Sequence, residues 1–247
     1  MIFLKSDSEI EVMAQAGRIA GLCLQMVGSM IEPGITTREL DAAAEAFIRK
    51  HGAIPTFKGY QGFPATICAS VNEVVVHGTP DDTRLKEGDI VSIDVGATYG
   101  GFVGDTAMTF PVGKISPEAS RLLKATSEAL ALGIAQVREN GFIGDIGYAI
   151  SQHVRKYGFS VVRDYAGHGV GRDMHEEPSV PNFGIPGMGP RLRRGMVIAI
   201  EPMVNVGTWE VVTYPNMRVV TRDGSLSAHF EHTVAVTSDG PRCLTLV

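Results

Sequence analysis

The chain has 247 residues, of which 44% are hydrophobic, and it carries a formal net charge of −5 at neutral pH. This length and composition are enough for a sizeable core in one large domain or two small ones, and the negative charge argues against a protein that binds nucleic acid by neutralising phosphates. Three cysteines, Cys23, Cys68 and Cys243, are too few for a disulfide framework and suit a reducing cytoplasm.

The apolar stretch at the N-terminus, in MIFLKSDSEI, is too short for a signal peptide or a membrane span, so we expect a soluble, cytoplasmic protein. Ser6 and Glu9 then form a capping-box pattern, which predicts a long helix. Thr36 and Glu39 repeat the pattern and predict a second helix that ends near Gly52.

Short apolar runs that are typical of β-strands follow each pair of predicted helices. In the first half they cover 65–70, 73–76, 89–96 and 102–110. Ser116 and Pro117 have the form of an N-cap followed by proline at the first helical position, and they open two helices that end near Gly158. Strand-like runs return at 161–165, 196–201, 217–221 and 230–237. Helices followed by strands, twice, predict an α+β fold with a mostly antiparallel sheet rather than alternating βαβ units.

The two halves of the chain also match at a nearly constant offset. Three pairs lie 107 positions apart, namely Gly34 and Gly141, Gly88 and Gly195, and Asp94 and Glu201. Two similar halves can pack about a pseudo-twofold axis, so we expect their equivalent acids to face each other near that axis.

Asp94 and Asp105 flank the turn-like stretch TYGGF at equal distances from the point between Tyr99 and Gly100. Residues so placed lie opposite each other on paired strands, with Cβ atoms about 5 Å apart. Two carboxylates at that separation repel unless they are protonated or bridged by a cation. A single acid at a strand end is more often a solvated residue, but this pair predicts a divalent metal.

Further candidate ligands come from the second half. Glu201 ends one strand-like run, and Glu231 lies near the start of another. His168 and His175 lie in GHGVGRDMHEEP, where the glycines allow close backbone approach to a ligand and make a helix unfavourable. The spacing is not HExxH, which excludes the zincin motif. His229 shares the strand parity of Glu231, but we expect a structural role for it.

Four carboxylates and one imidazole form an oxygen-rich ligand set. Structural zinc sites prefer thiolates and several imidazoles, so this set better suits Mn²⁺, Fe²⁺ or Co²⁺, although it is compatible with Zn²⁺. Two such ions about 3.5 Å apart can share bridging carboxylates and a hydroxide.

Taken together, these segments resemble the type I methionine aminopeptidases, in their short bacterial form, among the M24 metallopeptidases. The resemblance covers nearly the whole chain and rests, in order, on SVNEVVVHGTP, DVGATYGGFVGDTAMTF, GHGVGRDMHEEP, IEPMVN and SAHFEHT. It implies the pita-bread fold, a curved antiparallel sheet covered by helices, in a single catalytic domain over 1–247 with pseudo-symmetric halves of about 1–113 and 114–247. It also implies a hydrolase that removes the N-terminal methionine from nascent proteins when the second residue is small.

The resemblance assigns a role to each candidate ligand. Asp94 would chelate one divalent metal, and His168 and Glu201 would hold the other. Asp105 and Glu231 would bridge both ions.

The resemblance also implies catalytic residues and a second cation site. Glu201 would accept a proton from the water that bridges the metals. His175 would stabilise the tetrahedral oxyanion, and His77 would contact the scissile peptide nitrogen or its proton. A monovalent-cation site of the family is matched here by Asn72, Val74 and Ser227.

The methionine pocket of the family is matched by Tyr60, Phe63, Cys68 and His77, with His175 nearby, and aromatic and sulfur side chains suit a thioether. Three positions depart from the family pattern. Gln61 stands where a histidine is common, Met174 where a phenylalanine precedes the second histidine, and Met217 where a tryptophan often covers the pocket. Because methionine is more flexible than the residues it replaces, we expect wider tolerance at the first or second substrate position.

Two other functions compete with this one. Prolidases and Xaa-Pro aminopeptidases use the same five ligands but usually carry an extra N-terminal domain. A pita-bread binding module without catalysis would typically lose metal ligands, and all five are present here. We expect a monomer that acts on the N-terminal methionine of peptides and nascent chains, without membrane or direct nucleic-acid recognition. The basic residues Arg191, Arg193 and Arg194 are compatible with a transient ribosome contact and also with a solvated loop.

Overall fold

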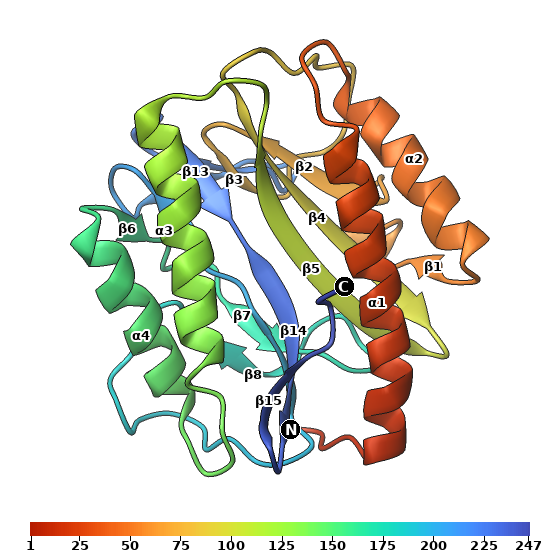
Figure 1. Ribbon diagram of the computed structural model, residues 1–247, viewed down its shortest axis with the longest axis vertical. Helices are drawn as coiled ribbons and strands as arrows, with labels where there is room; N and C mark the ends of the chain where they lie inside the picture. The colour runs from red at the N-terminus through yellow and green to blue at the C-terminus, as the bar shows by residue number, and fades with distance from the viewer.

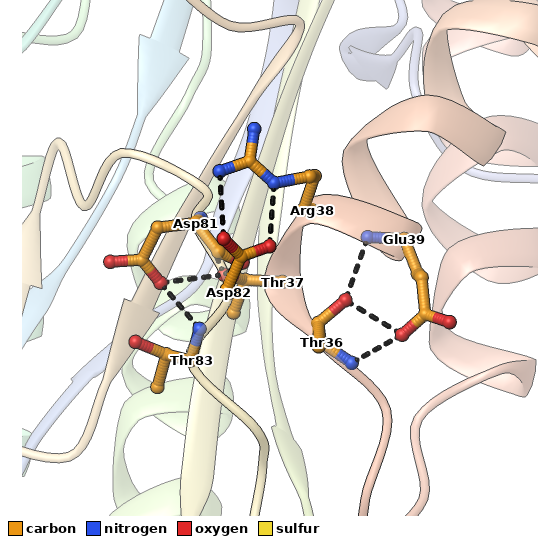
Figure 2. Close-up of polar contacts among 7 residues, drawn as sticks. All are labelled: Thr36, Thr37, Arg38, Glu39, Asp81, Asp82 and Thr83. Atoms are coloured by element: carbon orange, nitrogen blue, oxygen red, sulfur yellow. Dashed lines mark hydrogen bonds and ion pairs between the residues drawn. The ribbon is translucent and has the colours of Figure 1, made fainter.

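The computed structural model describes residues 1–247, and its first two helices begin where the capping boxes predict them. Helix α1 covers Asp7–Ser29 and helix α2 covers Thr37–Lys50. At the start of α2, Thr36 Oγ1 accepts a hydrogen bond from the backbone nitrogen of Glu39 at 3.2 Å, and the Glu39 carboxylate accepts one from the backbone nitrogen of Thr36 at 2.8 Å (Figure 2). These reciprocal bonds satisfy two donors that the helix itself cannot pair.

A second pair of helices, α3 at Pro117–Ile134 and α4 at Ile143–Lys156, precedes the strands of the second half. The strands of the first half are β1 Ile54–Pro55, β2 Ile67–Val71, β3 Val74–Val76, β4 Ile90–Tyr99 and β5 Phe102–Pro111, with a 3-10 turn η1 at Tyr60–Gly62. Those of the second half are β6 Ser160–Val161, β7 Gly167–Gly169, β8 Glu176–Val180, β9 Val197–Ile200, β10 Met203–Asn205, β11 Val211–Thr213, β12 Val219–Thr221, β13 Ser227–His229, β14 Glu231–Thr237 and β15 Gly240–Cys243.

The main sheet joins both halves of the chain in one antiparallel array. Its strand order is β1-β4-β5-β14-β9-β7-β8, with β2 also paired to β4 and β15 to β14. Within this sheet the two halves meet where β5 pairs with β14, with Glu231 opposite Ala107. The α+β class and the mostly antiparallel sheet that the sequence predicts are confirmed.

Each helix pair covers the strands of its own half. Buried residues such as Leu40 and Ile93 join α1 and α2 to β2 and β4, whereas Leu122 and Val234 belong to the core between α3, α4 and the second set of strands. Figure 1 shows α1 and α2 at the right and α3 and α4 at the left, with β4, β5 and β14 between them. None of the helices combines the length and apolar content that crossing a membrane requires.

The two halves repeat local structure at the offset seen in the sequence. Helices α2 and α4 both have 14 residues and begin and end 106 positions apart. An isolated β-bridge joins Thr36 to Arg84 ahead of α2, and another joins Phe142 to Arg191 ahead of α4. These bridges occupy corresponding positions just before the second helix of each half.

The register of the β4–β5 hairpin differs from the prediction that Asp94 and Asp105 lie directly opposite each other. Asp94 pairs with Ala107, and Asp105 pairs with Gly96. The turn is centred between Gly100 and Gly101, with φ of 57° and 79°, rather than between Tyr99 and Gly100. Two consecutive positive φ values are what a two-residue hairpin turn of this kind requires, and two glycines provide them without strain. The two acids are therefore diagonal neighbours on one face of the sheet.

The capping box of α2 can be tested by a single substitution. Thr36→Ala removes the side-chain acceptor for the Glu39 backbone nitrogen, so we expect the free energy of unfolding to fall by about 1 kcal/mol. Thr36→Ser keeps the hydroxyl and should stay within about 0.5 kcal/mol of the natural protein, measured by urea denaturation. Equal stability of the alanine and serine variants would show that the cap does not stabilise α2.

Candidate active site

Three acids of the site project from the sheet face that the helices do not cover. Side chains alternate between the two faces of a strand, and Ile93 and Val95 point into the α1–α2 core, so Asp94 points to the other face. Across the sheet, Asp94 lies opposite Ala107, which in turn lies opposite Glu231. The small side chain of Ala107 leaves space between these two carboxylates, and Asp105 lies two residues along on the same face.

The other two predicted ligands come from β7 and from the end of β9. His168 Nε2 lies 3.8 Å from Asp105 Oδ2 and 3.5 Å from Glu201 Oε1. The second ring nitrogen, Nδ1, is 2.9 Å from the backbone oxygen of Gly169, so it carries the proton and donates to that carbonyl. This hydrogen bond leaves the Nε2 lone pair free to bind a metal.

The structure brings all five predicted ligands to one place. One ligand atom from each of Asp105, His168 and Glu231 lies within 4.8 Å of the others. Three buried carboxylate oxygens have no hydrogen-bond partner, namely Asp94 Oδ1, Asp105 Oδ1 and Glu231 Oε1. Buried polar atoms are rarely left unpaired in a protein, so these oxygens fit a cation that they would coordinate.

The electrostatics of the cluster lead to the same conclusion. Burial, together with the nearby charge of Glu201, raises the pKa of Asp105 to about 8, and burial raises the pKa of Glu201 to about 8. Burial and the neighbouring Asp105 also raise the pKa values of Asp94 and Glu231 well above those usual for aspartate and glutamate. Burial lowers the pKa of His168 to about 4, which leaves a neutral ligand. Four ionised carboxylates carry a charge of −4, which two divalent cations would balance.

A cavity of about 370 Å³ opens over the cluster. All predicted pocket residues line it, namely Tyr60, Phe63, Cys68, His77, Met174, His175 and Met217, together with Gln61. The cavity walls also include His229, for which a structural role was expected, and residues that the sequence did not single out, namely Phe57, Val76, Tyr165, Ala166 and Met203. The mixture of aromatic and sulfur-containing walls with a polar floor is typical of a site for a small apolar side chain with a reactive polar end.

His229 is in the site, not in the structural position expected for it. Its Nε2 lies 3.4 Å from Glu201 Oε2, and its pKa is lowered by burial. The strand parity that it shares with Glu231 was the signal that it faces the site. Tyr165 and Met203 could have been found as near neighbours of His168 and Glu201, whereas nothing in the local sequence marks Phe57.

The two candidate catalytic histidines are held by different contacts. His175 Nδ1 lies 2.8 Å from the Tyr60 hydroxyl. His77 packs edge-to-face against Tyr165, with ring centroids 5.8 Å apart, and its backbone has a φ of 60°. Burial lowers the pKa of His77 to about 4, and it also lowers the pKa of His175. Both rings are therefore neutral at pH 7, and each offers one N–H donor and one acceptor.

The residues matched to a monovalent-cation site are not among those that line the cavity over the carboxylate cluster. The backbone nitrogen of Ser227 donates to the backbone oxygen of Asn72 at 2.9 Å. Val74 is two residues beyond Asn72, at the start of β3. The structure thus brings Asn72 and Ser227 together from different halves of the chain.

Comparison with known proteins gives one consistent result. Residues 11–238 match the model of metallopeptidase family M24. The chain is 53% identical to a methionine aminopeptidase of Clostridium acetobutylicum, over 100% of this chain and 99% of the relative. It is also similar to a crystal structure of methionine aminopeptidase from Rickettsia prowazekii, with a TM-score of 0.98, 43% identity and full coverage of both chains. A prolidase from Pyrococcus furiosus shares the fold at 24% identity and a TM-score of 0.80, with 99% of this chain and 65% of the prolidase covered.

Metal removal should make the stability of the protein fall as the pH rises from 7 to 8. Asp105 and Glu201 have a pKa of about 8 in the folded protein, so they are largely protonated at pH 7 and still about half protonated at pH 8. In the unfolded chain, with ordinary pKa values near 4, they have lost these protons. His168 and His77 are neutral in the folded protein at these pH values and largely neutral when unfolded. The folded state therefore binds more protons, and raising the pH favours unfolding.

We expect EDTA-treated protein to lose at least about 1–2 kcal/mol of unfolding free energy between pH 7 and pH 8, measured by urea denaturation, because the raised pKa values of Asp94 and Glu231 act in the same direction. Protein loaded with Mn²⁺ is the control and should show no such loss, because bound cations keep the carboxylates ionised. Unchanged stability of the metal-free protein across this range would contradict the raised pKa values.

Proposed function

The chain belongs to metallopeptidase family M24 and to its methionine aminopeptidases, and we propose that it hydrolyses the first peptide bond of proteins that begin with methionine. The observation that carries this proposal is the convergence of four carboxylates, with Asp105 and Glu231 buried, and one unprotonated imidazole nitrogen beneath an apolar cavity. The reaction is metal-dependent hydrolysis, and the preferred second residue of the substrate is a small one.

The five ligands divide between two divalent cations in this proposal. Asp94 would hold one ion, His168 and Glu201 would hold the other, and Asp105 and Glu231 would contribute to both. When bound, such ions would polarise the scissile carbonyl and lower the pKa of the attacking water. The oxygen-rich set favours Mn²⁺, Fe²⁺ or Co²⁺ and is compatible with Zn²⁺.

Three further side chains act on the substrate. The Glu201 carboxylate takes up the proton that the attacking water releases. The neutral His175 donates a hydrogen bond from Nε2 to the oxyanion that develops on the scissile carbonyl, because Nδ1 accepts from the Tyr60 hydroxyl. His77 contacts the scissile peptide nitrogen or its proton, and packing against Tyr165 holds its ring over the cavity.

The apolar part of the cavity receives the methionine side chain. Phe63 and Cys68 are buried, and Tyr60 completes an aromatic and sulfur wall that suits a thioether. Gln61 and Met217 form part of the rim, and both have a left-handed backbone, with φ of 49° and 69°. Met174 and Met217 offer flexible walls, which is the basis for the proposed wider tolerance at the first or second substrate position.

Several finer features belong to the same proposal. Residues 1–247 form one catalytic domain with halves of about 1–113 and 114–247, active as a monomer in the cytoplasm, and all three cysteines are free. Asn72, Val74 and Ser227 bind a monovalent cation. The exposed Arg191, Arg193 and Arg194 are available for a transient ribosome contact, although Arg194 already pairs with Asp7 at 2.7 Å.

Prolidase activity is the alternative with the same fold and ligands. Because the chain matches a prolidase at only 24% identity, that likeness supports the fold alone. A peptide panel separates the two activities: we expect cleavage of Met-Ala-Ser and none of Xaa-Pro-Ala peptides in which Xaa is not methionine. Cleavage of the proline peptides at a comparable rate would favour the prolidase function.

The metal requirement is testable with one substrate, Met-Ala-Ser. A chelator should abolish hydrolysis, and adding back Mn²⁺, Fe²⁺, Co²⁺ or Zn²⁺ in turn identifies the ions that restore it.

Asp105→Asn removes one charge from a bridging ligand, so we expect at least about a hundredfold loss of metal affinity and of activity. His175→Ala should keep metal affinity, measured by calorimetry, but lower kcat by about a hundredfold or more. Normal turnover by His175→Ala would rule out its role at the oxyanion.

The rim prediction needs two further variants. Met217→Trp and Met174→Phe fill the wall with larger and stiffer side chains. We expect each variant to lower kcat/KM by about tenfold for substrates with a bulkier first or second residue. The measurement is kcat/KM over a panel of tripeptides, with Met-Ala-Ser as the reference. Identical cleavage profiles of the natural protein and both variants would contradict the proposal.

A further inference from the structure

The turn that carries His175 has no regular secondary structure of its own. It runs over 171–175 between β7 and β8 and places Met174 and His175 at the cavity. The carboxylate of Glu176, at its end, bonds back to its beginning: Oε1 accepts from the backbone nitrogen of Arg172 at 3.0 Å. One side chain therefore closes the turn.

The other oxygen of the Glu176 carboxylate forms an ion pair with Lys5, near the N-terminus. Glu176 Oε2 lies 2.6 Å from Nζ of Lys5, and the two side chains are only 6% and 5% exposed. The backbone of Lys5 is fixed in turn, because its nitrogen donates to the backbone oxygen of Gly195 at 2.7 Å. Lys5 Nζ also donates to the backbone oxygen of Phe3 at 3.3 Å.

A glycine in the same segment makes room for this pair. A Cβ atom at position 171 would lie 2.7 Å from Cε of Lys5 and closer still to the carboxylate of Glu176. The backbone of Gly171 also accepts a hydrogen bond from the backbone nitrogen of Val103 on β5 at 2.9 Å. The turn is thus attached to the strand of Asp105 on one side and to the N-terminal segment on the other.

The Lys5–Glu176 ion pair differs from the surface ion pairs of this protein in how deeply it is buried. The Arg38–Asp82 pair near α2, drawn in Figure 2, is 62% and 83% exposed and has water as an alternative partner. In the Lys5–Glu176 pair both side chains are almost fully buried, so each charge depends on the other for compensation. The pair therefore ties the turn, and with it the backbone next to His175, to the N-terminal segment.

We propose that Lys5 and Glu176 are positioning residues that hold His175 where it acts on the substrate. The proposal rests on the proposed function, in which His175 stabilises the oxyanion. Tyr60 orients the His175 ring, and the ion pair fixes the backbone next to it. Catalysis depends steeply on such placement, since a misplacement of about 1 Å can cost about a hundredfold in rate.

The test is a double-mutant cycle with His175, on Mn²⁺-loaded enzyme with Met-Ala-Ser as the substrate. Lys5→Met and Glu176→Gln should each lower kcat about tenfold or more and leave KM and Mn²⁺ affinity within about threefold. In the His175→Ala background the same substitutions should change kcat by less than about twofold, because their effect passes through His175.

Arg38→Met is the matched control, and it should leave kcat unchanged in both backgrounds. Unchanged kcat in Lys5→Met and Glu176→Gln would overturn the proposal, and so would an equal loss with and without His175, which indicates general destabilisation. If Lys5→Met does not fold, as judged by circular dichroism, the isosteric Glu176→Gln decides by the same criteria. A normal kcat for His175→Ala alone would instead refute the proposed role of His175, and the inference with it.

Discussion

The convergence of four carboxylates at one point, with Asp105 and Glu231 buried and Asp94 and Glu201 only partly exposed, is the constraint on which the rest of the molecule depends. Without compensating charge they resist ionisation, which is why burial raises the pKa of Asp105 and Glu201 to about 8. The fold brings them together by antiparallel pairing across the junction of the halves, with Ala107 between Asp94 and Glu231. The two helix pairs stabilise the sheet from the opposite face, so the acids do not have to contribute to the core.

Much of this arrangement could be predicted from the sequence, because it depends on residues that are close together in the chain. Capping boxes mark where α1 and α2 begin, and strand alternation indicates which face Asp94 occupies. The hairpin register was not predictable from symmetry about the acids, because it depends on which two residues of the turn adopt positive φ. Choosing Gly100 and Gly101 as the central residues would have given the observed pairing.

Contacts between residues far apart in the chain could not be predicted from local sequence patterns. The partners Lys5 and Glu176 are separated by 171 positions, and neither has a neighbouring motif that indicates the other. His229 was missed because a lone histidine is more often structural, and its partner Glu201 belongs to another strand. The comparisons with relatives establish the family, but these contacts come from the geometry alone.

The rim of the cavity has a feature that bears on inhibitor design. Gln61, His77 and Met217 all line the cavity, and all have the left-handed backbone that side chains other than glycine rarely adopt. A compound that relies on chelating the cations would bind any enzyme with the same five ligands. A compound that also contacts Gln61 and Met217 would meet an amide side chain and a thioether whose placement depends on this backbone conformation. Selectivity for this chain should therefore be sought at the cavity mouth rather than at the carboxylate floor.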